Sequence, residues 1–236
     1  ETAYSLQGLE YATNLTSITL NYGVNSNGNS DGSHAGNFYQ GDVRDISPLG
    51  KLTKLTSLDI QDNKVSDVSV LAHLTNLTEF DASMNYIGDF RPLKGLSKLE
   101  KITCGNQFVK LAPIYIDRKK LTAHIAGNYY LADGSKAVLT PQGALGEPIR
   151  YDSQSKYPRY VRWYVLGLKT VNFVNQDGNG GLNFSHIREQ LSGEAIPDGF
   201  QHTSVVKQKE RFFLLGVYKS NNNGSFIDLS VVQPYI

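Results

Sequence analysis

The chain has 236 residues and a formal net charge of +1, from 23 basic and 22 acidic side chains that are mixed along its length. This balance offers no bulk attraction to nucleic acid, and no run of about 18 apolar residues predicts a membrane-spanning helix. The one cysteine excludes an intramolecular disulfide, and the 14 tyrosines and 22 glycines favour strands and turns over helices.

Residues 6–20, LQGLEYATNLTSITL, open a pattern that becomes regular between Leu55 and Lys110, where apolar residues recur every 22 positions. The clearest columns are Leu55, Leu77 and Leu99; Leu58, Phe80 and Ile102; and Ile60, Ala82 and Cys104. The form L-x-x-L-x-L-x-x-N with this period predicts a leucine-rich repeat solenoid, in which each repeat is a short strand followed by a 3-10 or short helix. Cys104 falls in a core column, so we interpret it as a small buried residue.

The first repeat is longer than the others. Its columns at Leu15 and Ile18 recur at Leu55 and Leu58, which is an offset of 40 residues instead of 22. An insertion of about 18 residues therefore lies at residues 24–41, and its sequence VNSNGNSDGSHAGNFYQG is typical of an outward polar loop.

The loop at residues 24–41 is a candidate part of a binding site, because long loops on a rigid scaffold are often functional. Its aromatic residues Phe38 and Tyr39 either form an exposed contact point or fold back onto the solenoid. Asn27, Asn29 and Asp31 are typical of the first half of a calcium loop, but Phe38 stands where the bidentate glutamate is required. We therefore predict no metal ion and no cofactor.

The strand residues of each repeat are expected to alternate between the core and the opposite, concave face of the solenoid. We call the outward set the concave strip and predict that it binds a ligand; it consists of Ser57, Asp59, Gln61, Glu79, Asp81, Ser83, Lys101 and Thr103. The concave strip is polar, slightly acidic and without an aromatic anchor, so the alternative is a merely solvated face. Asn63 and Asn85, just after the strands, are expected to form a ladder that satisfies backbone groups of the turns.

Catalytic chemistry is not predicted. Asp59 and Asp81 fall on neighbouring expected strands and are the best candidates for an acid–base pair. The concave face is open and wet, however, and it offers little means to raise the pKa of either carboxyl. None of the five histidines is spaced with another histidine or with Cys104 as metal ligands are.

Several segments between residues 4 and 112 resemble the internalin family of bacterial surface proteins. They read LEYATNLT, ISPL, LTKL and NLT, at Leu9–Thr16, Ile46–Leu49, Leu52–Leu55 and Asn76–Thr78. The resemblance implies a secreted or wall-attached protein of a Gram-positive bacterium that uses its repeats for recognition. The chain departs from the family in having about four repeats and no helical cap before Glu1. We expect the secretion signal and the wall anchor to lie outside this chain.

Beyond residue 114 the period ends, and short alternating runs predict antiparallel strands. We therefore divide the chain into a leucine-rich repeat domain at 1–114, a small β module at 115–168 that caps the repeats, and a second β module at 169–236. Internalin-like proteins often carry an immunoglobulin-like sandwich after the repeats, which implies an Ig-like fold for 115–168. The last segment resembles a bacterial mucin-binding-protein repeat through VNFVNQDG at 171–178 and IPDGF at 196–200, which implies a β-grasp-like fold and affinity for mucin glycans.

The predicted function is non-enzymatic adhesion or recognition at the bacterial cell surface or cell wall. The expected ligand is a host or extracellular protein or glycan, mucin among them, bound by a monomer through the concave strip and the loop at 24–41. One alternative is a structural spacer that displays other parts of a longer protein; an enzyme is the less favoured one. A spacer should bind nothing, and an enzyme should show a closed pocket with a buried carboxylate.

Overall fold

The computed structural model describes residues 4–21, 41–141, 173–187, 212–222 and 225–236. The contacts within the chain are concentrated in two compact units. The first contains residues 1–107, 130–135 and 219–229, and the second contains residues 108–129, 136–218 and 230–236. No helix in these described ranges is long and apolar enough to cross a membrane.

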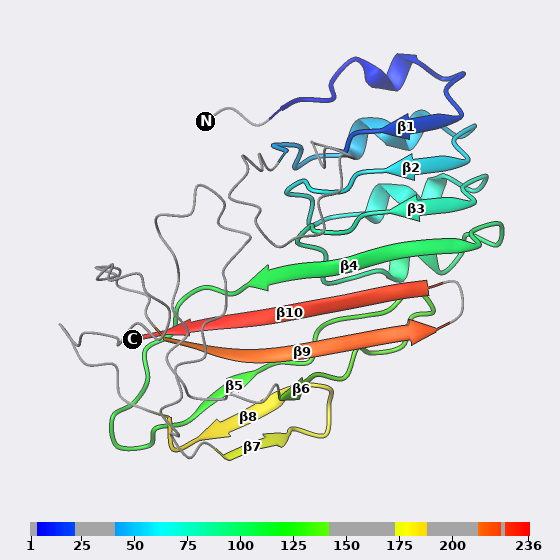
Figure 1. Cartoon of the computed structure of the whole chain (residues 1–236). Helices are drawn as coiled ribbons and strands as arrows, with labels where there is room; N and C mark the ends of the chain where they lie inside the picture. Colours follow the sequence, from blue (N-terminus) through cyan, green and yellow to red (C-terminus); the bar gives the residue numbers. More distant parts are fainter. Residues whose placement is uncertain (1–3, 22–40, 142–172, 188–211, 223–224) are drawn as a thin grey trace, which may run out of the picture. The chain divides into compact units, whose positions relative to one another are not determined.

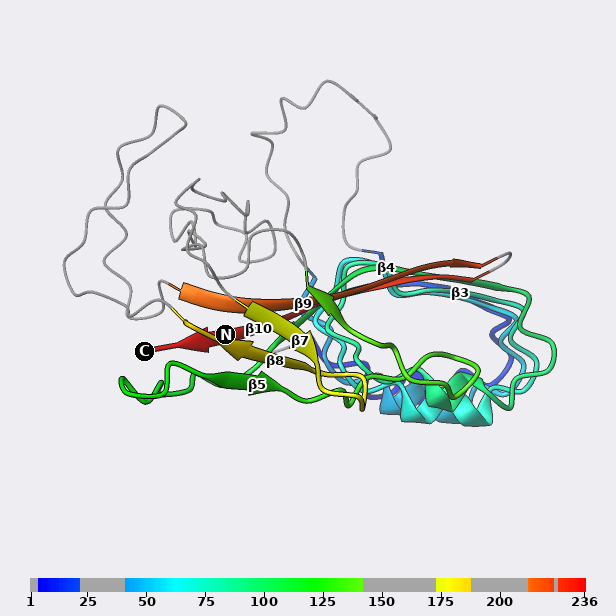
Figure 2. The same cartoon turned by 90° about the horizontal axis from the view of Figure 1, so that it is seen from below.

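The first unit is a leucine-rich repeat solenoid, as the 22-residue period predicts. Its parallel strands are β1 (Ser17–Thr19), β2 (Ser57–Asp59), β3 (Glu79–Asp81) and β4 (Lys101–Lys110), stacked in this order (Figure 1). Its 3-10 helices are η1 (Leu9–Tyr11), η2 (Ser47–Lys51), η3 (Ser69–His73) and η4 (Arg91–Leu93). Figure 2 shows the strands on one side of this unit and the helices on the other. Ile18 pairs with Leu58, which confirms the 40-residue offset of the first repeat.

The core of the solenoid is built from the leucine columns. Leu58, Phe80 and Ile102 lie in register on β2, β3 and β4, and all three side chains are buried. The 3-10 helices contribute Leu49 and Leu71 from the opposite side, both fully buried. Each such leucine contributes roughly 2 kcal/mol by leaving water, so repetition of the columns is what holds the stack together.

Cys104 is also a core residue, which confirms the prediction from its column. Its side chain is buried in the same cluster as Ala82 and Ile60. Burial raises the pKa of the Cys104 thiol far above its ordinary value, so the group stays protonated and unreactive.

A ladder of buried side-chain amides joins consecutive repeats. It consists of Asn63, Asn85 and Gln107, and the oxygen of each accepts the peptide N–H of the residue 20 positions earlier, at 3.3, 3.0 and 3.0 Å. The amide nitrogens donate to strand carbonyls; that of Asn85 reaches the oxygens of Ile60 at 2.8 Å and Ala82 at 3.0 Å. These contacts satisfy turn groups that would otherwise be buried without partners, as the sequence analysis predicted for the asparagines.

The residue before each amide of this ladder adopts a left-handed backbone conformation. The φ angles are 56° at Asp62, 59° at Met84 and 55° at Asn106, again one residue per repeat. This conformation is unfavourable for a side chain such as methionine, and the amide that follows holds each turn in place. These three positions hold residues of different chemical types, so the periodicity of the sequence did not reveal the left-handed conformation.

The repeat sheet continues past β4 with strands from the far end of the chain. The order is β1-β2-β3-β4-β10-β9-β6, where β10 is Ser225–Tyr235, β9 is Phe212–Asn222 and β6 is Thr140–Pro141. Residues 225–229 of β10 and 219–222 of β9 belong to the first unit. The side chain of Ile227 is buried in the repeat core together with Ile102 and Cys104. β10 therefore covers the edge and the core that the last repeat would otherwise expose.

The second unit contains an antiparallel sheet in the order β5-β8-β7, formed by Ala123–Ile125, Leu182–Ser185 and Phe173–Gln176. Its side chains Ile125, Leu182 and Phe184 are buried. Asp177 organises the β7–β8 turn, because its carboxylate accepts the N–H groups of Asn179 and Gly181 at 2.7 and 2.8 Å.

Asp177 also forms an ion pair with His124 Nε2 at 2.8 Å. The hydrogen bond to His124 and those from the turn lower the pKa of Asp177 to about 2. Because the pKa of this carboxyl is depressed in the folded state, its contribution to stability is present above the ordinary pKa of 3.8 and is lost as the pH falls toward 2.

The chain beyond residue 114 is β-rich, as expected, but the Ig-like and β-grasp-like modules are not confirmed. Strand β5 comes from the segment 115–168 and pairs with β8 from the segment 169–236. Of the alternating runs in these two segments, those at 160–165 and 204–207 lie outside the described residues, whereas those at 212–218 and 226–232 lie in β9 and β10. The division at residue 168 therefore remains a prediction.

Removing one amide of the ladder should destabilise the solenoid strongly. Asn85→Ala leaves the N–H of Val65 buried without its acceptor, and it removes one donor each from the carbonyls of Ile60 and Ala82, which keep the amides of Asn63 and Gln107; we expect the free energy of unfolding to fall by about 3 kcal/mol. Asn76→Ala is the matched control, since the Asn76 amide bonds Thr53 and Lys98 at the surface; less than about 1 kcal/mol should be lost. Urea unfolding measures both values, and equal losses would contradict the ladder's role.

Gly127→Ala should disrupt the second unit. A Cβ atom at this position would lie 2.3 Å from the carbonyl carbon of Gly180 and 2.4 Å from the nitrogen of Gly181, so the two backbones would have to separate. We expect a loss of about 2 kcal/mol or more in the free energy of unfolding. The control is Gly95→Ala, where nothing lies within 4 Å of the added atom; a similar loss in both variants would contradict the close approach.

Candidate functional site

The concave strip lies on one side of the repeat sheet, as predicted. Ser57, Glu79 and Lys101 form one row across β2, β3 and β4, and Asp59, Asp81 and Thr103 form the next. Glu79 and Lys101 are exposed, whereas the other six residues of the strip are partly exposed. The structure therefore brings the predicted strand residues together in two ordered rows. Phe38 and Tyr39, the two predicted loop residues, lie outside the described residues.

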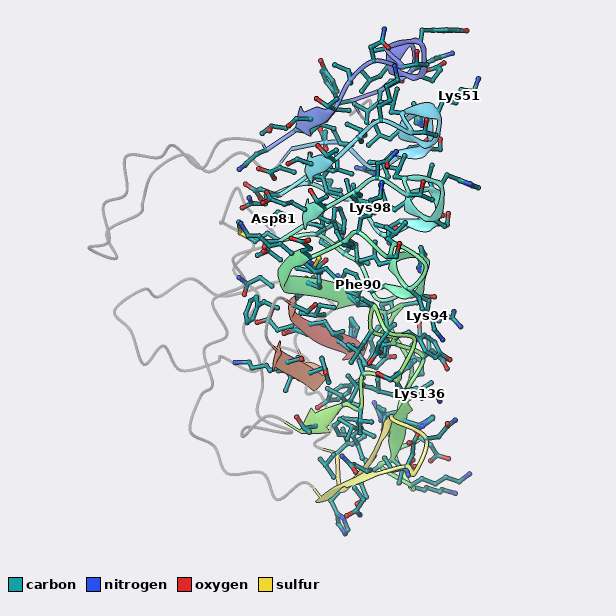
Figure 3. All side chains as sticks on the ribbon, turned by 90° about the vertical axis from the view of Figure 1, so that its right-hand side faces the viewer. Lys51, Asp81, Phe90, Lys94, Lys98 and Lys136 are labelled. Carbon is teal, nitrogen blue, oxygen red and sulfur yellow. The ribbon has the colours of Figure 1, made fainter. Side chains whose placement is uncertain are left out.

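The opposite side of the solenoid has a different charge. Figure 3 shows Asp81 on the strand side and Lys51 and Lys94 on the helix side, with the buried Phe90 between them. Acidic side chains on the helix side are engaged in local structure: the carboxylates of Asp45 and Asp67 each accept the N–H of the residue two positions on, at 2.8 Å. The concave strip is the more acidic of the two faces in residues 41–107, because it carries Asp59, Glu79 and Asp81 against one cation, Lys101.

Asp59 and Asp81 are direct neighbours on adjacent parallel strands. Each orients its carboxylate by accepting the N–H two residues on: that of Gln61 at 2.9 Å and that of Ser83 at 3.0 Å. Burial raises the pKa of Asp81, and the neighbouring charge of Asp59 raises it further, while the hydrogen bonds from Ser83 and the charge of Lys101 act against this. The sequence analysis expected the open face to offer little means of raising either pKa; the partial burial of Asp81 is the means that the structure shows.

An aromatic side chain stands at the end of the concave strip, contrary to the expectation from the repeats alone. Phe226 on β10 is 40% exposed and lies over Gly105 of β4. A Cβ atom on Gly105 would be 2.5 Å from Cε1 of the Phe226 ring and 3.5 Å from Oδ1 of Asp228. The N–H of Asn106 donates to the carboxylate of Asp228, which fixes that side chain beside the ring.

The sequence contained one signal for this arrangement. Gly105 occupies the repeat column filled by Gln61 and Ser83, so a side chain is missing at one outward position of β4. A glycine inside a strand often marks a place where another group approaches closely. The identity of that group was not readable, because Phe226 is far away in the chain.

The chemistry of the concave strip is that of an open polar surface with one apolar contact point. It offers carboxylates, hydroxyls, amides and one aromatic ring, and these groups suit the binding of a partner better than the enclosure of a reacting substrate. Within the described residues, no group of three or more His, Cys, Asp or Glu side chains is placed to hold a metal ion.

Comparison with solved structures shows an internalin-like leucine-rich repeat fold. The functional domain of InlJ from Listeria monocytogenes matches 80% of this chain and 31% of its own, with a TM-score of 0.50 and 12% identity. An internalin from the same species, InlF, is 37% identical over 44% of this chain and 26% of its own, with a TM-score of 0.35. Internalin C2 of L. monocytogenes is 39% identical over 28% and 27%, with a TM-score of 0.25.

This chain spans between 26% and 31% of the length of those solved chains. No protein-family profile matches it, and no curated protein does. The fold is therefore established by the repeats and by the likeness to InlJ. The resemblance of residues 169–236 to a mucin-binding-protein repeat is not confirmed.

Neutralising Asp81 should stabilise the solenoid at neutral pH. Because its pKa is raised above 3.8, the folded state holds the Asp81 proton more tightly than the unfolded state, and stability falls as the pH rises through this window. Asp81→Asn keeps the acceptor for the Ser83 N–H and removes the repulsion from Asp59, so we expect a gain of about 0.5 kcal/mol at pH 7 and none at pH 3.

The control for this experiment is Asp67→Asn. Asp67 accepts the N–H of Ser69 in the same way but is exposed on the helix side. Unfolding in urea at the two pH values gives the comparison. A gain of the same size in both variants, or a loss in Asp81→Asn at pH 7, would rule out the strain between the paired carboxylates.

Proposed function

We propose that this chain is a non-enzymatic recognition module of a bacterial cell-surface protein and that its concave strip binds a host or extracellular protein or glycan. The observation that carries the proposal is the separation of roles along each strand. The buried leucines and the amide ladder meet the structural needs of the repeat, while the outward rows from Ser57 to Thr103 add nothing to the core. Solenoids use such surfaces for binding.

The loop at residues 24–41 is proposed as a second part of the same binding surface. The described chain resumes at Gly41, whose N–H donates to the carbonyl of Asp62 at 2.8 Å. Asp62 directly follows Gln61, the last residue of the concave strip on that repeat. Gly41, the residue that follows Phe38 and Tyr39 most closely among those described, is therefore tied next to the strip, which supports their contribution to binding.

The proposed location is the outside of a Gram-positive cell, either at the surface or attached to the wall. Support comes from the internalin-like fold and from the resemblance of the repeat segments to that family. The proposed partner is a protein or a glycan, and mucin is included because of the resemblance of residues 169–236. We propose that the chain acts as a monomer and needs no cofactor.

An array of extracellular-matrix proteins and of glycans, including mucin-type glycans, tests this function. We expect the chain to bind at least one class of spot and the double variant Asp59→Asn/Asp81→Asn to bind about ten-fold more weakly, or about 1.4 kcal/mol. The matched control is Asp45→Asn/Asp67→Asn, which removes two charges in the same hydrogen-bonding arrangement on the helix side and should leave binding unchanged.

Two results would overturn the proposal. A chain that binds nothing on either array behaves as a structural spacer, and equal binding by both double variants removes the concave strip from the site. Because the asparagine variants keep the acceptors for the N–H groups of Gln61 and Ser83, loss of binding is not expected to reflect unfolding. Circular dichroism of each variant checks this.

A further inference from the structure

We propose that the ligand of the concave strip is a cationic segment of a protein, with one arginine or lysine side chain on the ring of Phe226 and a second between Asp59 and Asp81. This inference rests on the proposed function of the strip and names the chemistry of its ligand. It is carried by three features of the described residues: an exposed aromatic ring, an excess of carboxylates, and the pairing of two like charges.

The ring of Phe226 is presented as a platform. Ile227 points into the repeat core, so its neighbours Phe226 and Asp228 point to the opposite face, where the concave strip lies. Gly105 provides the space beneath the ring, since any larger residue would collide with it. A cation above an aromatic face is attracted by the negative charge density of the ring, and a carboxylate at the ring's edge strengthens the site.

The charges of this face favour a cationic ligand over an anionic one. Four carboxylates lie on it: Asp59, Glu79, Asp81 and Asp228. The strip contains one cation, Lys101, and the neighbouring strand β9 carries the exposed Lys219. The carboxylates therefore outnumber the cations even if both lysines are counted, and a peptide with two positive charges complements the face.

The pair Asp59 and Asp81 points to the place of the second cation. Like charges directly opposite each other on neighbouring strands repel, and no cation is hydrogen-bonded between them in the described residues. An ammonium or guanidinium group bound there would replace repulsion by attraction to both carboxylates. A neutral sugar would donate hydroxyl groups to these carboxylates but bring no positive charge, which is why a cationic segment is favoured over a glycan.

The spacing of the two sites defines the ligand further. The ring lies over β4, whereas the paired carboxylates lie between β2 and β3; at about 5 Å per strand the two sites are roughly 8 to 10 Å apart. A peptide in the polyproline II conformation rises about 3.1 Å per residue with three residues per turn, so two cationic residues three positions apart lie on the same side and about 9 Å apart. A peptide that crosses the strands in this way needs no pocket, only the exposed rows of the strip.

The test uses a synthetic array of 12-residue peptides with net charges from about −4 to +4, in which two arginines are placed one, three or seven positions apart. The whole chain should bind the cationic peptides best when the spacing is three, and binding should weaken as salt rises. Phe226→Leu, which keeps an apolar cover on Gly105 but removes the ring, should reduce affinity about ten-fold.

Three further variants separate the contributions. Asp228→Asn retains an acceptor for the Asn106 N–H and should also weaken binding, which keeps the test valid if the leucine variant folds poorly. Phe226→Tyr should bind like the native chain. Tyr11→Leu is the control for loss of an exposed aromatic elsewhere, because Tyr11 is 80% exposed on η1, and it should have no effect.

The outcomes distinguish this inference from the proposed function. Equal binding of neutral and cationic peptides, or full binding by both Phe226→Leu and Asp228→Asn, overturns the cationic ligand. Binding to glycans that depends on Phe226 overturns it as well, but it leaves the recognition function standing. If the chain binds nothing on the peptide array and nothing on the protein and glycan arrays, both the cationic ligand and the recognition function are overturned.

Discussion

The fold depends on the hydrogen bonds of Asn63, Asn85 and Gln107. A solenoid with such short repeats must turn sharply after each strand, and every turn leaves peptide groups in the interior. One side-chain amide per repeat meets these groups on its own repeat and on the one before it, at distances between 2.8 and 3.4 Å for the bonds of Asn85 and Gln107. Because these buried groups are satisfied from inside, the outward strand positions are not needed to fill the core, and Asp59 and Asp81 bond only the N–H groups of Gln61 and Ser83 and the amide of Asn21 among the bonds described. The same interaction that permits the stack therefore leaves a row of side chains available for binding.

The exposed end of the repeat stack is covered by a different interaction. A leucine-rich repeat cannot bury its own last face, and β4 would expose both a strand edge and the side chains of Ile102 and Cys104. β10 pairs next to β4 and inserts Ile227 into that core. Alternation along β10 then forces its neighbours Phe226 and Asp228 onto the outward face. Closure of the core and the appearance of an aromatic ring on the face of the concave strip are thus two consequences of one strand pairing.

The features that could be predicted from the sequence are those that repeat over a short distance along the chain. The leucine columns, the core position of Cys104, the offset of the first repeat and the asparagine ladder all repeat within 22 or 40 residues, and all are confirmed. Phe226 was missed because it reaches Gly105 through a pairing of segments about 120 residues apart, as the bond between Asn106 and Asp228 shows. Short alternating runs predict strands but not their partners, so the pairing of β5 with β8 was likewise not predictable.

At Asp59 and Asp81, the stability of the fold and the proposed binding role make opposite demands on the side chains. Most other regular positions of the repeat agree with the fold: apolar residues face the core, amides fill the turns, and the aspartates at positions 45 and 67 accept the N–H groups of Ser47 and Ser69 at the start of the 3-10 helices. The carboxylates of Asp59 and Asp81 lie in register and repel each other, which destabilises the fold, and the burial of Asp81 destabilises it further. An asparagine at position 81 would keep the hydrogen bond to Ser83 without the charge. A local conflict of this kind, set within a consistent framework, is typical of a residue retained for a partner rather than for the fold.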